Sequence, residues 1–301
     1  MASFLLACFF ILLITVLNVP SLGQAKSDYW QENLPNTVMP YAVETALPST
    51  NTTENSIWVN TDEVIIQNYA GVSGHCHDDK IIEFLKSRFV LPKTLQVGSQ
   101  ISIQLKTIVG ITTKFPTEKH LPQFNSKNLA QNLKYFSINS NSEEAFVMNL
   151  TINKCENSNP INGKWQFCAT SLRDLLTFTN ATLGLKRLAA ISPPSPSASG
   201  ILRYKVTKVE SLVGAESELL LCHRYGFPYA VFYCHQPAAT KAFSVHLAAE
   251  REDGLEAIAV CHMETSKWSA SYIGFKALGV KPGTPICHFL HSRDLLMYAN
   301  N

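Results

Sequence analysis

Four cysteine–histidine dyads dominate the C-terminal third of the chain and constrain its fold more than any other feature. Their spacing is CH-x10-CH-x25-CH-x24-CH, and they are Cys222-His223, Cys234-His235, Cys261-His262 and Cys287-His288. Two uncommon residue types stand side by side four times within 67 residues, which chance does not explain. Any structure for this chain must therefore accommodate all four dyads.

Three of the four dyads lie at or near the end of an apolar, strand-like run. Because successive side chains of a strand point to opposite faces, we expect the cysteine and histidine of each dyad to face opposite ways. One layer would then collect cysteines for cross-linking, and the other layer would collect imidazoles.

The dyad histidines are candidate metal ligands, and they are His223, His235, His262 and His288. Imidazole suits copper, zinc, nickel and iron, and oxidised cysteines would leave ligation to nitrogen alone. The CxxC and HxxxH spacings of zinc fingers are absent. The alternative is that these histidines only pack or form local hydrogen bonds.

Residues 1–24 have the pattern of an export signal. Phe4 to Val19 is almost wholly apolar, Pro20 breaks the run, and small residues predict cleavage near Gly23 or Ala25. A membrane anchor would need roughly 20 apolar residues. The run is shorter than that, and no later stretch is long enough, so we expect a cleaved signal and no integral anchor.

Export to an oxidising compartment favours disulfides. Seven cysteines remain once Cys8 leaves with the signal, so one is left over or pairs between chains. Cys155 and Cys168 bracket a polar loop and predict a local disulfide. Closing a loop of about 14 residues would contribute roughly 3 kcal/mol in the chain-entropy model.

The remaining cysteines and three sequons complete the picture of a secreted protein. We expect the dyad cysteines to form disulfides whose connectivity stays open, and they are Cys222, Cys234, Cys261 and Cys287. The N-x-S/T tripeptides predict N-glycosylation at Asn51, Asn149 and Asn180.

Composition indicates a globular protein, with 46% hydrophobic and 16% charged residues over a length that can bury a core. The formal net charge of +2 is too small to indicate a nucleic-acid partner. It is compatible with weak attraction to an acidic polysaccharide.

The chain before residue 202 predicts short helices and few strands. Residues 25–77 are polar, broken by prolines and predicted to be variable and partly disordered, with the compact domain running from 78 to 292. Helices are predicted from Asp78 through Phe89, from Ser126, and from Thr170 or Ser171, and strands over 101–105 and 145–152. Residues 192–200 have the composition of a linker.

From residue 202 the pattern predicts almost only strands, and residues 293–301 form a tail. Strand-like runs cover 204–209, 219–222, 229–234, 243–247, 255–261, 272–280 and 286–290, with turns at 226, 253–254 and 281–283. The fold class is therefore α+β and β-rich: a mostly antiparallel sheet in the C-terminal half, a few short helices upstream, and disulfide staples.

The sequence holds no serine–histidine–acid triad, glycine-rich phosphate loop, HExxH motif or paired-carboxylate signature. Glu264 and Asp294 lie near dyad histidines and are interpreted as surface charges. His246 is expected on the polar face of a strand, and His291 is a weaker ligand candidate than the dyad histidines.

The dyad spacing and its surroundings resemble the plant-specific BURP-domain family, whose defining feature is this run of four CH dyads. The agreeing segments are CHRYGFPYAVFYCH at 222–235, AVCHMETSKW at 259–268 and VKPGTPICHFL at 280–290. Upstream, residues 84–98 resemble the family's opening region, and Cys155 and Cys168 match its cysteine pair. The resemblance covers about residues 80–292; Tyr272 stands near the place where a further histidine is usual. His75-Cys76-His77 lies just before this region and is not part of the family's pattern, which makes Cys76 the best candidate for the unpaired thiol.

The resemblance implies a secreted or vacuolar plant protein. Some members are seed or anther proteins, some respond to stress, and one group is the non-catalytic β subunit of a cell-wall polygalacturonase. Another group comprises copper-dependent peptide cyclases that crosslink Tyr or Trp side chains within their own core peptides. In that group the dyad histidines would carry copper, which makes copper the cofactor implied here.

Two functional hypotheses follow. The first is a non-catalytic extracellular protein of the apoplast or cell wall, or of the vacuole, that acts in development or stress and meets a wall polysaccharide or wall protein. The second is an autocatalytic copper-dependent cyclase, which needs a core peptide with an aromatic acceptor. Tyr29-Trp30 supplies aromatic residues but no obvious core, so the first hypothesis is favoured.

Overall fold

The computed structural model describes residues 22–48, 86–104, 113–117, 120–157, 166–184, 188–193, 201–214, 218–249 and 254–299. These residues form two antiparallel sheets with short helices around them, held by three disulfides. The predicted α+β, β-rich, disulfide-stapled fold is confirmed. The predicted export signal up to residue 21, the linker from residue 194 and Cys76 lie outside the described residues.

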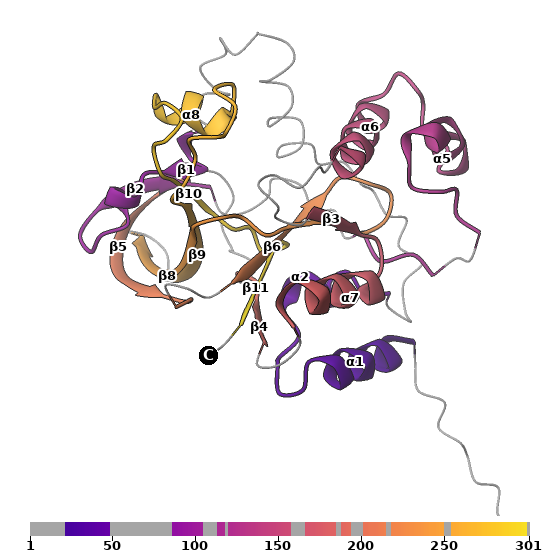
Figure 1. Cartoon of the computed structure of the whole chain (residues 1–301), viewed down its shortest axis with the longest axis horizontal. Coiled ribbons are helices and arrows are strands. Elements are labelled where there is room, and N and C mark those ends of the chain that lie inside the picture. Colours follow the sequence, from indigo (N-terminus) through magenta and orange to yellow (C-terminus); the bar gives the residue numbers. More distant parts are fainter. Residues whose placement is uncertain are drawn as a thin grey trace, which may run out of the picture.

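The first sheet has six strands in the order β1-β10-β9-β8-β5-β2. Figure 1 shows it bending strongly, with its long strands β5, β8 and β9 on the left of the view. Its strands are β1 (Phe89–Val90), β2 (Gln100–Ile103), β5 (Leu202–Ser211), β8 (Thr240–Ala249), β9 (Leu255–His262) and β10 (Ile286–Phe289).

The second sheet has five strands in the order β3-β7-β6-β11-β4. Its central hairpin joins β6 to β7 across the turn around Gly226. The strands are β3 (Gln166–Ala169), β4 (Leu188–Ile191), β6 (Leu219–Tyr225), β7 (Val231–His235) and β11 (Leu295–Ala299).

Three groups of helices surround the sheets (Figure 1). The first group lies near β11 and β4 and consists of α1 (Leu22–Asn33), α2 (Tyr41–Glu44) and α7 (Leu172–Leu183). The second group lies beyond β3 and consists of α5 (Leu129–Tyr135) and α6 (Glu143–Glu156). The third is α8 (Ile273–Leu278), which lies beside β1. Two short 3-10 helices, η1 (Pro92–Thr94) and η2 (Ser126–Asn128), complete the elements. Among the described residues, no helix has both the length and the apolar content needed to cross a bilayer.

Local sequence signals explain the elements that were predicted correctly. The Ser171 side chain accepts a hydrogen bond from the Asp174 N–H and caps α7, whose buried face carries Leu172, Leu175 and Leu176. In β2, Ile101 and Ile103 are buried while the residues that alternate with them are exposed, which is the pattern of a half-buried strand. The helix expected at Ser126 begins as η2, capped by the side chain of the preceding asparagine.

Two predicted strands are helices. Residues 145–152 belong to α6, where the Ser142 side chain caps the first turn and Ala145, Met148 and Ile152 are buried at helical spacing. Residues 273–278 form α8, which ends at Gly279 in the left-handed conformation (φ 65°) that glycine adopts without steric cost.

The predicted helix through Phe89 is wrong at its end. Phe89 lies in β1, opposite His288 of β10. The positions expected at its start, from Asp78 to Leu85, lie outside the described residues. A strand partner more than a hundred residues away overrides the local helical spacing.

The folded part of the chain extends past the predicted domain boundaries at both ends. Part of the segment expected to be variable, residues 29–47, forms α1, α2 and their buried contacts, including Trp30 and Val43. Residues 295–299, expected in a tail, form β11 between β6 and β4 in the second sheet. Both segments therefore contribute to the folded core.

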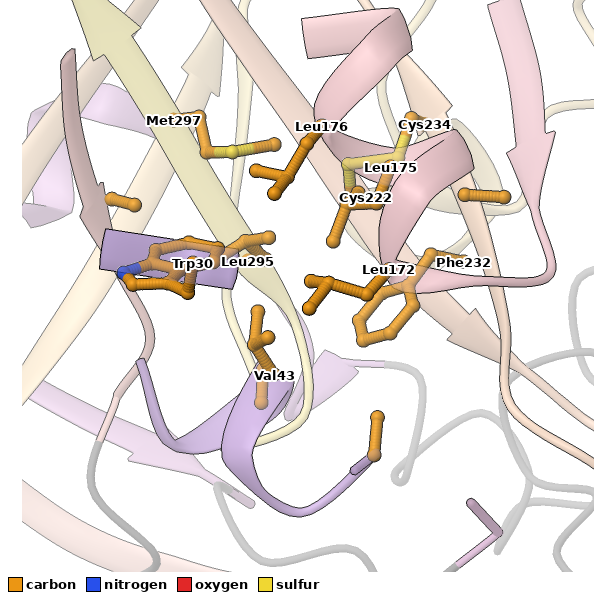
Figure 2. Close-up of a cluster of buried hydrophobic side chains, with 14 of the residues drawn as sticks. Trp30, Val43, Leu172, Leu175, Leu176, Cys222, Phe232, Cys234, Leu295 and Met297 are labelled. Atoms are coloured by element: carbon orange, nitrogen blue, oxygen red, sulfur yellow. A yellow bond between two sulfur atoms is a disulfide. The ribbon is translucent and has the colours of Figure 1, made fainter. Parts of the chain in front are cut away.

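The hydrophobic core divides into layers. One cluster lies between the second sheet and helices α1, α2 and α7, and Figure 2 shows Trp30, Val43, Leu172 and Leu295 within it. A second cluster is formed by the six-stranded sheet's own inward face. A third joins the two sheets and contains Leu219, Leu221, Ile258, Val260 and Leu296. The sheets thus pack against each other as well as against the helices.

Candidate metal centre

The dyad cysteines form two disulfides between directly opposed residues of neighbouring strands. Cys222 of β6 faces Cys234 of β7, and Cys261 of β9 faces Cys287 of β10; each pair is bonded. All four are fully buried. The third disulfide joins Cys155 at the end of α6 to Cys168 in β3, the local pairing that the loop predicts.

Strand alternation separates the two halves of each dyad, as the adjacency predicts. Cys222 and Cys234 belong to the core between the second sheet and its helices, where Figure 2 draws them beside Leu175. Cys261 and Cys287 belong to the inward face of the first sheet. The histidines are on the opposite face of each strand. His223 is on the same face of β6 as Leu221, and His262 is on the same face of β9 as Val260; both of these apolar residues lie between the two sheets.

The four dyad histidines meet at one end of this inter-sheet layer. Their ring centroids lie 5.4 Å apart for His223 and His235, 6.5 Å for His235 and His262, 5.4 Å for His262 and His288, and 5.7 Å for His288 and His223. The four distances close a circuit with two rings from each sheet. We call this group the histidine cluster.

Burial keeps three members of the histidine cluster neutral. Loss of solvent is the main cause that lowers the pKa of His262 to about 3. Burial and then the neighbouring imidazoles lower the pKa of His235 and of His288 well below the ordinary value. At neutral pH these three imidazoles are therefore uncharged, and each keeps one nitrogen lone pair.

Aromatic rings enclose the histidine cluster. Tyr233 stacks on His235 with ring centroids 5.4 Å apart, Trp268 lies 5.0 Å from His262, and Phe89 lies 6.5 Å from His288. The Tyr233 hydroxyl donates to a side-chain oxygen of β3, Gln166 Oε1, at 2.6 Å. This apolar lining accounts for the strong desolvation of the imidazoles.

The spacing of two donor atoms fits a shared metal ion. His262 Nε2 and His288 Nε2 are 3.3 Å apart. Two nitrogens each about 2.0–2.1 Å from a tetrahedral ion would stand roughly 3.3 Å from each other. Across the part of the chain that the structure describes, no three His, Cys, Asp or Glu side chains already surround a common point as ligands do. Binding by more than two imidazoles would therefore require some ring reorientation.

Asp294 is a site residue that the sequence interpretation missed, and its assignment as a surface charge is wrong. Its side chain is 3% exposed, and its Oδ1 lies 3.2 Å from His223 Nδ1. Glu264, in contrast, is exposed as expected and accepts a hydrogen bond from the Ser266 backbone. The signal that identifies Asp294 is its place directly before the apolar run Leu295–Met297, which is a buried strand.

The other two histidines that the sequence singled out lie outside the cluster. His246 is on β8 with its Nε2 3.8 Å from Glu210 Oε2, on a partly exposed face. His291 is buried, and its Nε2 lies 2.6 Å from Arg88 Nη1. A guanidinium only donates, so this nitrogen of His291 accepts from Arg88 and is not available to a metal.

Comparison with known proteins identifies the family. The family model described as the BURP domain matches residues 88–299, well over half of the chain.

The chain belongs to the BURP-domain family.

Curated relatives from several plants show the same similarity. BURP domain protein RD22 of Arabidopsis thaliana is 32% identical over 78% of this chain and 60% of its own length. BURP domain-containing protein 3 of Oryza sativa subsp. japonica is 35% identical over 75% of this chain and 52% of its own. Protein RAFTIN 1B of Triticum aestivum is 35% identical over 52% of this chain and 44% of its own. The matches thus span about half of each relative's length.

In this BURP domain the matched region starts at Arg88, one residue before β1, and runs through the end of β11. It contains all four dyads and Asp294. Helices α1 and α2 precede it, although their side chains complete one of its hydrophobic clusters.

Proposed function

We propose that this protein is an exported plant BURP-domain protein that binds copper through His223, His235, His262 and His288. The observation that carries the proposal is the meeting of four imidazoles from two sheets while all four neighbouring cysteines are in disulfides. The donors left are imidazole nitrogens, which suit copper.

The residues fit such an ion in three respects. Low pKa values leave the imidazoles of His235, His262 and His288 neutral, and a metal binds only the neutral form. The 3.3 Å separation of two Nε2 atoms brings two donors close enough to share one ion after a small adjustment of the rings. The aromatic lining limits water at the cluster. When bound, copper would supply one-electron chemistry; the protein residues supply neutral donors and a dry environment.

The cellular role that we propose is non-catalytic, in the cell wall or apoplast, with the vacuole as the alternative, and in development or the response to stress. Three disulfides support an oxidising compartment. Of the candidate glycosylation sites, Asn180 is exposed on α7 and Asn149 is half-buried on α6, while Asn51 lies outside the described residues. A wall polysaccharide or wall protein is the proposed partner.

Catalysis on the protein's own N-terminal aromatic pair is disfavoured by the position of Trp30. A peptide cyclase needs an accessible aromatic acceptor. Trp30 is fully buried in α1, and its Nε1 donates to the Thr37 carbonyl at 2.9 Å. Tyr29 packs beside the same cluster. The pair Tyr29-Trp30 therefore belongs to the core of the fold.

The test of the proposed function is copper retention by the secreted protein. Protein purified from a plant or insect-cell secretory host, stripped with chelator and reloaded with Cu(II), should keep copper through desalting. The double variant His262→Gln with His288→Gln should lose more than about tenfold in affinity, because it removes two of the donors. His246→Gln, which changes a histidine on an outer face, is the matched control and should bind like the parent protein.

Two outcomes would contradict parts of this proposal. If the parent protein keeps no copper with its four dyad histidines intact, the copper site is wrong. If incubation with copper and oxygen lowers the intact mass by two hydrogens, the non-catalytic role is wrong and the cyclase hypothesis takes its place.

A further inference from the structure

Asp294 occupies the crossover that connects the two sheets. The chain leaves β10 of the first sheet at Phe289 and enters β11 of the second sheet at Leu295. Within this short connection the Asp294 side chain points inward and is buried. A carboxylate at such a place needs specific partners, because burying it without them is strongly unfavourable.

The two oxygens of Asp294 have different partners. Oδ2 accepts a hydrogen bond from the His291 backbone N–H at 2.9 Å, and the Asp294 N–H returns a bond to the His291 carbonyl at 2.9 Å. Oδ1 lies 3.2 Å from His223 Nδ1. The carboxylate thus connects the crossover of one sheet to a dyad histidine on β6 of the other.

The geometry around Asp294 requires donors on both sides. An ionised carboxylate only accepts hydrogen bonds, so each of its partners must supply a proton. The His291 N–H does so at Oδ2, and His223 Nδ1 is the nitrogen next to Oδ1.

This placement selects one tautomer of His223. A neutral imidazole carries one proton and one lone pair on its two nitrogens. A carboxylate beside Nδ1 favours the proton on that nitrogen, so the lone pair is left on Nε2. Metal-binding histidines commonly donate their second N–H to a carboxylate in this way, which fixes the ring and strengthens the donor nitrogen.

A second contact steadies the segment that carries the carboxylate. Arg88 Nη1 lies 2.6 Å from His291 Nε2, and both residues are buried. Arg88 directly precedes Phe89, which is paired with His288. Arg88 thus contacts the His291 ring, and the His291 backbone contacts Asp294, which lies beside the His223 ring. These contacts connect β1, whose Phe89 is paired with His288, to His223.

We propose that Asp294 is a positioning residue for the histidine cluster: it holds His223 as the Nδ1–H tautomer with Nε2 as the donor, and Arg88 supports it through His291. The expected effect on copper affinity rests on the proposed copper site. The tautomer of His223, in contrast, is a property of the metal-free protein. Asp294 itself is not a ligand in this arrangement.

The decisive variant is Asp294→Asn, which has the same shape. The His291 N–H still needs an acceptor, so the new amide should keep its carbonyl oxygen there and turn its NH2 group toward His223 Nδ1. That nitrogen would then have to accept, and the proton would move to Nε2. Copper affinity should fall by roughly 10- to 100-fold, the usual effect of losing such a partner.

Three readouts test the proposal. The ¹⁵N shifts of His223 in the metal-free parent protein should show the Nδ1–H tautomer, and Asp294→Asn should convert it to Nε2–H. The nitrogen hyperfine pattern of bound Cu(II) should change in Asp294→Asn. Glu264→Gln removes an exposed carboxylate two residues from a dyad histidine and should change neither the tautomer nor the affinity.

The outcomes separate this proposal from the proposed function. Finding Nε2–H for His223 in the metal-free parent protein overturns the positioning role even if Asp294→Asn does not fold. Parent-like copper affinity in a folded Asp294→Asn protein also overturns it. Absence of copper binding in the parent protein refutes the copper site alone, since the tautomer measurement needs no metal.

Discussion

At the residue scale, one backbone step separates the two members of each dyad into different surroundings. The cysteines lie in the cores on the outer sides of the two-sheet contact, and the histidines lie between the sheets. Strand parity alone enforces this separation. A dyad that moved by one residue would place sulfur between the sheets and imidazole in an apolar core, so both the disulfides and the histidine cluster depend on one register.

The buried imidazoles predict a pH dependence of stability in the metal-free protein. Histidines of the unfolded chain titrate near pH 6.5, whereas the pKa of His262 in the folded protein is about 3. Between these values the unfolded chain binds more protons, so lowering the pH from about 6.5 toward 3 should lower the free energy of unfolding. The slope should reach about 1.4 kcal/mol per pH unit for each histidine shifted in this way.

Urea unfolding in the presence of chelator, between pH 6.5 and 5, measures this slope. The range lies above the pH at which the aspartates of the unfolded chain titrate. His262→Gln should make the slope shallower, and His246→Gln should leave it unchanged. A free energy of unfolding that stays constant over that range would show that the cluster is not desolvated as described.

At the element scale, cross-strand disulfides hold the strands that carry the histidines. Cys261–Cys287 fixes β9 against β10, and Cys222–Cys234 fixes β6 against β7. Cys155–Cys168 instead ties α6 to β3, whose Cys168 is the cross-strand partner of Tyr233 on β7. The first two disulfides join the strands that carry the dyads directly, whereas the third acts on them only through β3, so the first two should matter more for the histidine cluster.

Replacing disulfides by alanine pairs tests this difference. Removing Cys261–Cys287, whose sequence separation is 26 residues, should cost about 3.5 kcal/mol in the chain-entropy model. Removing Cys155–Cys168, with a separation of 13 residues, should cost about 3 kcal/mol. Unfolding curves measure both, and copper titration of the folded variants should show the larger loss of affinity for the first. Equal copper affinity in the two variants would contradict the link between β9–β10 pairing and the site.

At the scale of the whole molecule, the N-terminal helices complete a core that the BURP-domain match does not include. Trp30 and Val43 pack with α7 and the second sheet (Figure 2), and Leu34 belongs to the same cluster. Backbone contacts hold the same segment, since the Phe115 N–H donates to the Ala46 carbonyl at 2.6 Å. Residues 88–299 without these helices would leave an apolar face of α7 and the sheet uncovered.

Trp30→Ala should therefore destabilise the entire protein. The side chain is fully buried, and removing such a large group leaves a cavity that costs about 3–5 kcal/mol. Val38→Ala is the control in the same segment, because Val38 is 84% exposed and its truncation should stay within about 0.5 kcal/mol. Denaturant unfolding measures both; a Trp30→Ala variant as stable as the control would show that α1 is dispensable.

Much of the fold follows from local patterns that the sequence displays. Alternation predicts β2 and most strands after residue 202, and the Ser171 cap with its leucines predicts α7. The misassigned elements are short or ambiguous. The apolar run of α6 fits a strand until its Ser142 cap and helical burial are considered, and β1 forms only because β10 is there to pair with it. Local propensity is weak compared with such distant partners.

The family, the disulfide-rich β fold and the separation of cysteine from histidine within each dyad can be read from the sequence, because they depend on spacing and strand parity. The pairing of the dyad cysteines, the meeting of the four histidines and the burial of Asp294 beside His223 become visible only in the folded molecule. Those facts depend on how two sheets pack and on the crossover between β10 and β11. Contacts between segments that are distant along the chain leave no periodic trace in it.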